Sequence, residues 1–120
     1  MPATKVQLDE LIPLTPRVLH VLLALTEGAR HGYAIMEEVK ACSGGRVRVG
    51  PGTLYEALQT LDKKGLVTVV PNKPGDDPRR RYHKLTTLGR NVLQAEADRL
   101  GQLMRTIKSK NIQVGRARSI

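Results

Sequence analysis

The chain has 120 residues, enough for one domain with a small core. It carries 20 lysines and arginines against 11 acidic residues, and the formal net charge of +9 predicts a polyanionic partner, either nucleic acid or an acidic membrane face. No apolar run approaches the length of a membrane span, and no apolar segment follows the N-terminus, so we expect neither a transmembrane helix nor a secretory signal. The single cysteine, Cys42, excludes an internal disulfide and indicates a cytoplasmic protein. Three tyrosines without tryptophan or phenylalanine argue against a stacking platform for single strands.

The chain begins with an arm over residues 1–14, in which Leu8, Leu11 and Ile12 form one apolar stripe. A helix is predicted next, from residue 16 to about residue 27, with a threonine and a proline at its start. Because this helix is apolar on nearly all sides, we expect it at the centre of the domain.

A second helix is predicted over residues 34–42, where Ile35, Val39 and Cys42 share one face. Residues 46–49 alternate between arginine and valine, which predicts a short strand.

Residues 51–64 predict a third helix with a marked start and end. Pro51 suits the first helical position, and Gly65 suits the left-handed position after the last turn. One face of this helix is an apolar stripe and the opposite face is polar. The polar face could enter a DNA major groove, although taken alone it could equally be the solvated face of a surface helix. The apolar stripe consists of Leu54, Ala57, Leu58 and Leu61.

A β-hairpin is predicted from strands at residues 66–70 and 79–85, joined by a loop with a Pro-Gly pair suited to a type II turn. Its region from residue 73 to residue 84 holds five lysines and arginines against two aspartates. If residues 79–81 are extended, at most two of these three arginines face the same way, so either Arg79 and Arg81 or Arg80 alone is expected at the minor groove or backbone of DNA. One of the three can instead pair with Asp76, Asp77 or a helix carboxylate.

The last helix is predicted over residues 87–108, with an apolar seam spaced by four, three, four and three residues, as in coiled coils. At 1.5 Å per residue it would be roughly 33 Å long, too long to be used up in covering so small a domain. We therefore expect a homodimer in which the arm and the last helix of each chain pack on the other chain, followed by a loose basic tail at residues 109–120. The expected interface residues are Leu8, Leu11, Ile12, Leu93, Ala97, Leu100, Met104 and Ile107.

This order of elements predicts a mainly α (α+β) winged helix-turn-helix over residues 15–86, with a long C-terminal dimerisation helix. In this arrangement the helix at 51–64 reads the DNA and the tip of the hairpin is the wing. A twofold dimer then predicts a pseudo-palindromic site in double-stranded DNA, with half-sites about 34 Å apart.

Four groups of residues also carry a family resemblance. They are His31-Gly32-Tyr33-Ala34-Ile35, the run from Pro51 to Leu58, Leu61 with Gly65-Leu66-Val67, and Arg80-Arg81-Tyr82 with Leu85-Thr86 and Gly89. As a set they resemble the PadR family of bacterial transcriptional regulators. The resemblance implies a homodimer joined mainly through the last helix, a palindromic operator and usually repression. The chain departs from larger members in its short final helix, and no long C-terminal region follows that could hold an effector site.

The expected DNA contacts lie on the third helix, on the wing and at the start of the second helix. Tyr55 has the alternative of packing on the wing, Thr53 of a local structural hydrogen bond, and Tyr33 of a packed ring beside a capping His31. The candidate residues are Tyr33, Pro51, Gly52, Thr53, Tyr55, Gln59, Thr60, Lys63, Lys73, Arg79, Arg80 and Arg81.

Other functions have less support in the sequence. Neither a nucleophile elbow nor a phosphate-binding loop is present, so we expect no enzyme and no cofactor. The three histidines and Cys42 lack the spacing of a metal site, and a redox role for Cys42 lacks a second cysteine in the chain to resolve it. Two alternatives remain: a winged-helix module that binds an acidic protein, and a sensor of a small molecule held between subunits, for which the lack of large aromatic residues favours an aliphatic ligand or none.

Overall fold

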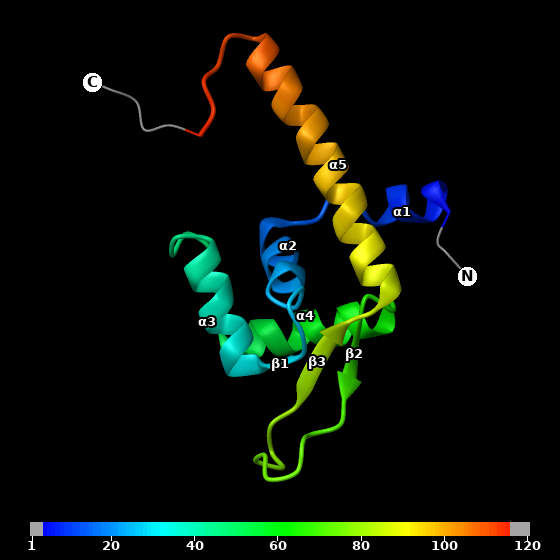
Figure 1. The fold of residues 1–120 in the computed structure, drawn as a ribbon, viewed down its shortest axis with the longest axis vertical. Helices are drawn as coiled ribbons and strands as arrows, with labels where there is room; N and C mark the ends of the chain where they lie inside the picture. Colours follow the sequence, from blue (N-terminus) through cyan, green and yellow to red (C-terminus); the bar gives the residue numbers. More distant parts are fainter. Residues whose placement is uncertain (1–3, 116–120) are drawn as a thin grey trace.

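The computed structural model describes residues 4–115, and it confirms the predicted α+β winged-helix fold with a long last helix (Figure 1). The predicted ends of the arm and of the tail, residues 1–3 and 116–120, lie outside the described residues. The elements in chain order are α1 (Lys5–Leu11), α2 (Pro16–Leu23), β1 (Arg30–His31), α3 (Gly32–Cys42), α4 (Pro51–Lys63), β2 (Val67–Val70), β3 (Tyr82–Leu85) and α5 (Thr87–Ser109).

The three strands form one antiparallel sheet in the order β1-β3-β2. In β2 and β3, Val67 pairs with Leu85 and Val70 pairs with Tyr82, so the hairpin projects as the wing at the opposite end of the molecule from the far end of α5 (Figure 1).

The strand predicted at residues 46–49 is wrong. The Ser43 hydroxyl bonds both the N–H and the carbonyl of Val47, which occupies the groups that a neighbouring strand would need. The free edge of β3 is taken instead by Arg30 and His31 of β1. The alternation in this segment reflects the inward direction of its valines, since Val49 is buried.

The core lies between helices α2, α3 and α4 and the inner face of the sheet. It is built of aliphatic side chains, with α5 adding Val92. The helix predicted from residue 16 to about residue 27 at the centre of the domain ends earlier, at Leu23, and Leu23 is 42% exposed beside a groove between α2 and α5. The fully buried aliphatic residues include Val21, Leu22, Leu25, Ile35 and Val39.

A tight junction joins the end of α4 to the start of α5. Gly65 has a φ of +78°, and the Leu66 N–H donates to the Leu61 carbonyl, which closes α4 with a Schellman motif. The Leu66 carbonyl then accepts the Thr86 N–H at 3.1 Å. A Cβ on Gly89 would overlap that same carbonyl oxygen, so only glycine lets the first turn of α5 approach so closely.

A buried carboxylate fastens the arm to α5. Glu96 is fully buried, accepts the Leu14 N–H at 2.6 Å and pairs with Arg99. The Arg99 guanidinium, helped by the Leu14 amide, holds the pKa of this carboxyl below its ordinary value against the opposing effect of burial.

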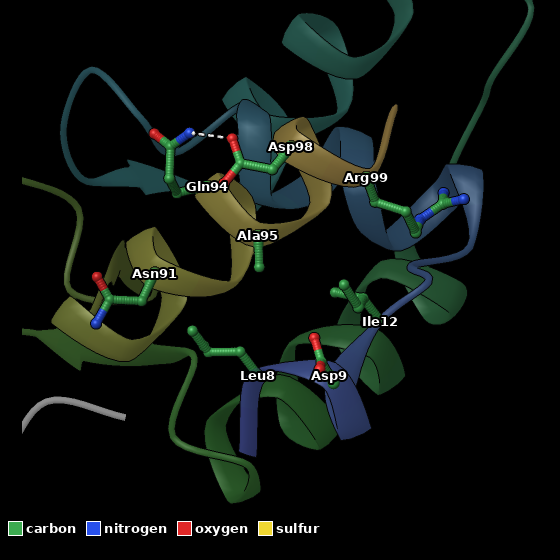
Figure 2. A pocket seen from close by; sticks show the side chains of 8 residues that line it. All are labelled: Leu8, Asp9, Ile12, Asn91, Gln94, Ala95, Asp98 and Arg99. Atoms are coloured by element: carbon green, nitrogen blue, oxygen red, sulfur yellow. Dashed lines mark hydrogen bonds between the residues drawn. The ribbon is translucent and has the colours of Figure 1, made fainter. Parts of the chain in front are cut away.

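The arm itself packs on its own chain. Figure 2 shows Leu8 and Ile12 beside the part of α5 that carries Ala95 and Arg99, across an open groove of about 830 Å³. Leu8, Leu11 and Ile12 are partly buried against the core of the same chain. Their apolar stripe is therefore no longer evidence that a second chain must cover it.

We expect Gly89→Ala to lower the free energy of unfolding by about 3 kcal/mol, because the new methyl group meets a backbone oxygen that cannot move away without opening the junction. Gly101→Ala in the same helix is the matched control. Its Cβ would meet only the flexible end of Arg105 at an ordinary distance, so alanine should stabilise α5 by about 0.5–1 kcal/mol. Urea denaturation of both variants is the measurement. Equal stability of the two variants would contradict the role of this close approach.

Candidate nucleic-acid interface

Three segments that are distant in the sequence meet around one open groove of about 510 Å³. They are the start of α3, the first two turns of α4 and the end of the wing tip. The groove has an aliphatic floor and a rim of tyrosines and arginines. Its lining residues are His31, Gly32, Tyr33, Met36, Pro51, Leu54, Tyr55, Leu58, Arg79, Arg80, Arg81 and His83.

The start of α4 is open to an anion. The other helices begin with a side-chain cap, for example Thr15 on α2, His31 on α3 and Thr86 on α5. The cap of α4 is Gly50, which offers no side-chain acceptor, so the amides of its first turn keep their hydrogen-bonding capacity. Free amides at a helix N-terminus attract phosphate oxygens.

Gly52, in the first turn of α4, has no heavy atom within 4 Å of the position that a Cβ would take. The fold therefore does not require a glycine there, whereas a glycine lets a ligand approach the backbone closely.

The wing tip is folded by its own aspartates. Asp76 accepts the Lys73 N–H at 3.0 Å, and the turn between them closes with Gly75 at a φ of +89°, as expected for the predicted type II turn. Asp77 binds the Arg79 guanidinium through both carboxylate oxygens, at 3.2 and 3.1 Å. This contact with Arg79 holds the pKa of Asp77 below its ordinary value.

The predicted extended run of residues 79–81 is wrong, because β3 begins only at Tyr82 and Arg79 lies in a turn. The directions of these arginine side chains therefore do not follow strand alternation, and one of them is fixed by an ion pair with Asp77. Arg79 is engaged by Asp77, whereas Arg80 and Arg81 are exposed and form no ion pair with another described residue. Arg80 and Arg81 are thus the arginines of the groove rim that have no carboxylate partner among the described residues.

Two tyrosines stand on the rim of the groove. Tyr33 is 66% exposed and Tyr55 is 56% exposed. The alternative of a packed Tyr33 ring is therefore wrong, while the predicted cap is confirmed, because His31 Nδ1 accepts the Ala34 N–H at 3.4 Å. A hydroxyl on an exposed ring beside cationic groups is well placed to donate to an oxyanion.

The remaining candidate residues of α4 lie on two faces of the helix: the face opposite the buried leucines, and the face that borders the segment joining α1 to α2. Thr53 and Thr60 line a second, smaller groove of about 370 Å³ beside the segment that joins α1 to α2, and no wing residue lines it. Lys73 is exposed at the wing tip and lines neither groove. The residues opposite the buried leucines are all exposed, and we call them the outer stripe: Gly52, Glu56, Gln59 and Lys63.

Sequence reasoning missed His83, which forms part of the groove floor. It is 7% exposed, its Nδ1 has no hydrogen-bond partner among the described residues, and burial lowers its pKa. The signal was available in the alternation of β3, which buries His83 and Leu85 on the same face.

Cys42 lies away from the groove and is not activated as a nucleophile. Cys42 is exposed and contacts Glu38 at 3.1 Å, and this hydrogen bond raises the pKa of the thiol, which disfavours the reactive thiolate. Within residues 4–115, no cluster of three ligating side chains suited to a metal ion is found. The described part of the chain also contains no helix with both the length and the apolarity to cross a membrane.

Three packed helices, of which the third is followed by an antiparallel hairpin, define a winged helix-turn-helix protein. Residues 19–95 match the model of the transcriptional regulator PadR-like family. Because this match spans more than half of the chain, the protein belongs to that family, whose members are transcriptional regulators rather than enzymes.

The chain is also similar to individual proteins and to solved structures. Transcriptional regulator Rv3488 of Mycobacterium tuberculosis is 33% identical over 89 residues, which are 74% of this chain and 79% of that protein. An uncharacterized 37.1 kDa protein of transposon Tn4556 from Streptomyces fradiae is 42% identical over 83 residues, 69% of this chain but only 22% of that protein. A solved structure of Bacillus subtilis PadR in complex with operator DNA is similar in fold, with a TM-score of 0.57 and 23% identity over 65% of this chain and 44% of that one.

Proposed function

We propose that the protein is a dimeric, sequence-specific repressor that acts in the cytoplasm and binds a pseudo-palindromic operator in double-stranded DNA. The observation that carries the proposal is the single groove at which the starts of α3 and α4 meet Arg80 and Arg81 of the wing. In this arrangement α4 enters the major groove of the duplex, and the wing lies along the neighbouring backbone.

The rim of the groove supplies phosphate contacts. The uncapped amides of α4, the hydroxyls of Tyr33 and Tyr55, and the guanidinium groups of Arg80 and Arg81 are all donors on one surface. Such contacts fix register and supply affinity without choosing a sequence. The role of the groove is therefore to place α4 against the bases.

The outer stripe of α4 supplies the contacts to base edges. Gln59 and Lys63 both lie there, and both are exposed to a DNA duplex that contacts this face of the helix. Glutamine pairs with the N6 and N7 edge of adenine, and lysine with the acceptors of guanine. Thr53 and Thr60 lie on the flank of α4 away from the wing and are suited to contacts with the far wall of the DNA major groove.

The dimer is formed through α5. Its C-terminal half stands clear of the other described elements (Figure 1). Leu100, Leu103 and Met104 are between 37% and 45% exposed there, and Leu23 of α2 adds to the same surface through the groove that it shares with Leu100. A second copy related by a twofold axis would remove this continuous apolar strip from water. The remaining residues proposed for this interface are Leu93, Ala97 and Ile107, with Leu8, Leu11 and Ile12 of the arm at its edge.

We expect Arg80→Ala to weaken binding to all duplexes and to make the plot of log affinity against log salt shallower by about 0.9 for each phosphate that the variant no longer neutralises. Lys108→Ala, at the far end of α5, is the matched control and should leave the slope unchanged. Fluorescence anisotropy with a selected duplex between roughly 50 and 200 mM salt measures both. Binding by the unmodified protein that is independent of salt would refute the proposed function.

We expect Gly52→Ala to separate folding from binding. Alanine should raise the free energy of unfolding by about 0.5 kcal/mol, because the helix gains a better helix former in open space. The same methyl group should weaken operator binding at least tenfold, because it holds the α4 backbone away from the DNA. Thermal denaturation and anisotropy on the same samples provide the two readouts, and undiminished binding would show that the backbone of α4 does not approach the duplex closely.

We expect Leu100→Glu to convert the dimer to a monomer and to abolish cooperative occupation of both half-sites, because it places two charges in the apolar strip. Val69→Glu is the control, since Val69 is similarly exposed but lies on β2, away from α5. Sedimentation equilibrium gives the mass of each variant. A Leu100→Glu protein that is still dimeric would place the interface elsewhere.

A further inference from the structure

The outer stripe of α4 contains an acidic residue at its centre. Gly52, Glu56, Gln59 and Lys63 are separated by four, three and four residues, so they share one line on the helix opposite Leu54, Leu58 and Leu61. All four are exposed. Glu56 is therefore an exposed carboxylate on the helix proposed to enter DNA, in a chain with a net charge of +9, and it also borders the groove that Thr53 and Thr60 line.

Glu56 has no partner within its own chain that explains it. It forms no ion pair with another described residue, although Arg17 and Lys64 line that same groove. A carboxylate that faces the phosphate backbone is repelled by it, so phosphate contact gives this residue no favourable role. The favourable partner for an acceptor-only group at this place is a hydrogen-bond donor on a base edge.

The major groove narrows the choice of base. Cytosine presents its N4 amino group there as a donor, whereas adenine presents its N6 amino group next to the N7 acceptor, which repels a carboxylate. Guanine offers only acceptors on this edge, and thymine offers an acceptor and a methyl group. Glu56 is thus matched to cytosine and mismatched to the other three bases.

We propose that Glu56 is a specificity-determining residue that selects a cytosine in each half-site through the N4 amino group. This inference rests on the proposed entry of α4 into the major groove. Glu56 and Gln59 are three residues apart, a rise of about 4.5 Å along the helix axis, close to the spacing of one base step. The selected cytosine therefore lies within about one step of the base that Gln59 contacts.

Selection of bound duplexes from a random pool tests the assignment with the full-length protein and with Glu56→Gln and Glu56→Ala. We expect the unmodified protein to prefer cytosine at one position of each half-site by roughly 5- to 150-fold. Glu56→Gln should shift that position toward adenine, because a glutamine side chain pairs with both N6 and N7. Glu56→Ala should make the position unselective while the other positions keep their preferences.

Glu27→Ala is the matched control, because it removes an exposed acidic side chain in the turn after α2 and should leave every position unchanged. Circular dichroism shows that each variant is folded. If both Glu56 variants select the same site with undiminished preference and only bind more tightly, Glu56 acts through its charge alone and the inference fails. If the unmodified protein selects no sequence at all, the proposed function fails instead, so the two failures are distinguishable.

Discussion

The close contact between the end of α4 and the start of α5 is the constraint on which the rest of the structure depends. Gly65 turns the chain, the Leu66 carbonyl accepts the Thr86 amide, and Gly89 leaves room for that carbonyl at a distance that no side chain would allow. Because α5 carries the proposed dimer surface and α4 the proposed reading surface, this junction transmits the geometry of the dimer to the DNA. In the proposed dimer, the separation of the two α4 helices would therefore be set by backbone contacts rather than by flexible side chains.

Three acidic side chains stabilise the fold through hydrogen bonds and ion pairs, while two arginines beside the groove form no ion pair with a described residue. Asp76 and Asp77 fold the wing tip, and Asp77 takes up Arg79. Glu96 fastens the end of the arm, at Leu14, to α5 from a buried position. The result leaves Arg80 and Arg81 unpaired beside the uncapped end of α4, which is the surface that an anionic ligand meets first. Glu56 is, like Glu27, an exposed acid that forms no ion pair with another described residue, but it lies on the outer stripe of the helix proposed to enter DNA.

Two of the wrong predictions have a common physical cause: the local sequence pattern does not show which backbone groups are bonded by side chains elsewhere in the chain. Residues 46–49 have the alternation of a strand, yet Ser43 occupies the backbone of Val47, and β1 takes the open edge of β3. The alternation expected for residues 79–81 failed because Asp77 folds the chain into a turn there. In each case a contact made by one polar side chain outweighed the propensity of the segment.

The sequence by itself determined helices α2 to α5, the hairpin and their order, though not β1, because apolar periodicity and the residues at helix ends act over a few neighbours. Pro51, Gly65 and the leucine stripe placed α4 correctly, and the spacing of the seam placed α5. Only the tertiary structure decided which side chains share a surface: that His83 forms the groove floor, that Thr53 and Thr60 turn away from the wing, and that the arm lies on its own chain. Those facts depend on the angles between elements, which are fixed by contacts such as that of Gly89 with Leu66 and are not encoded in any single segment.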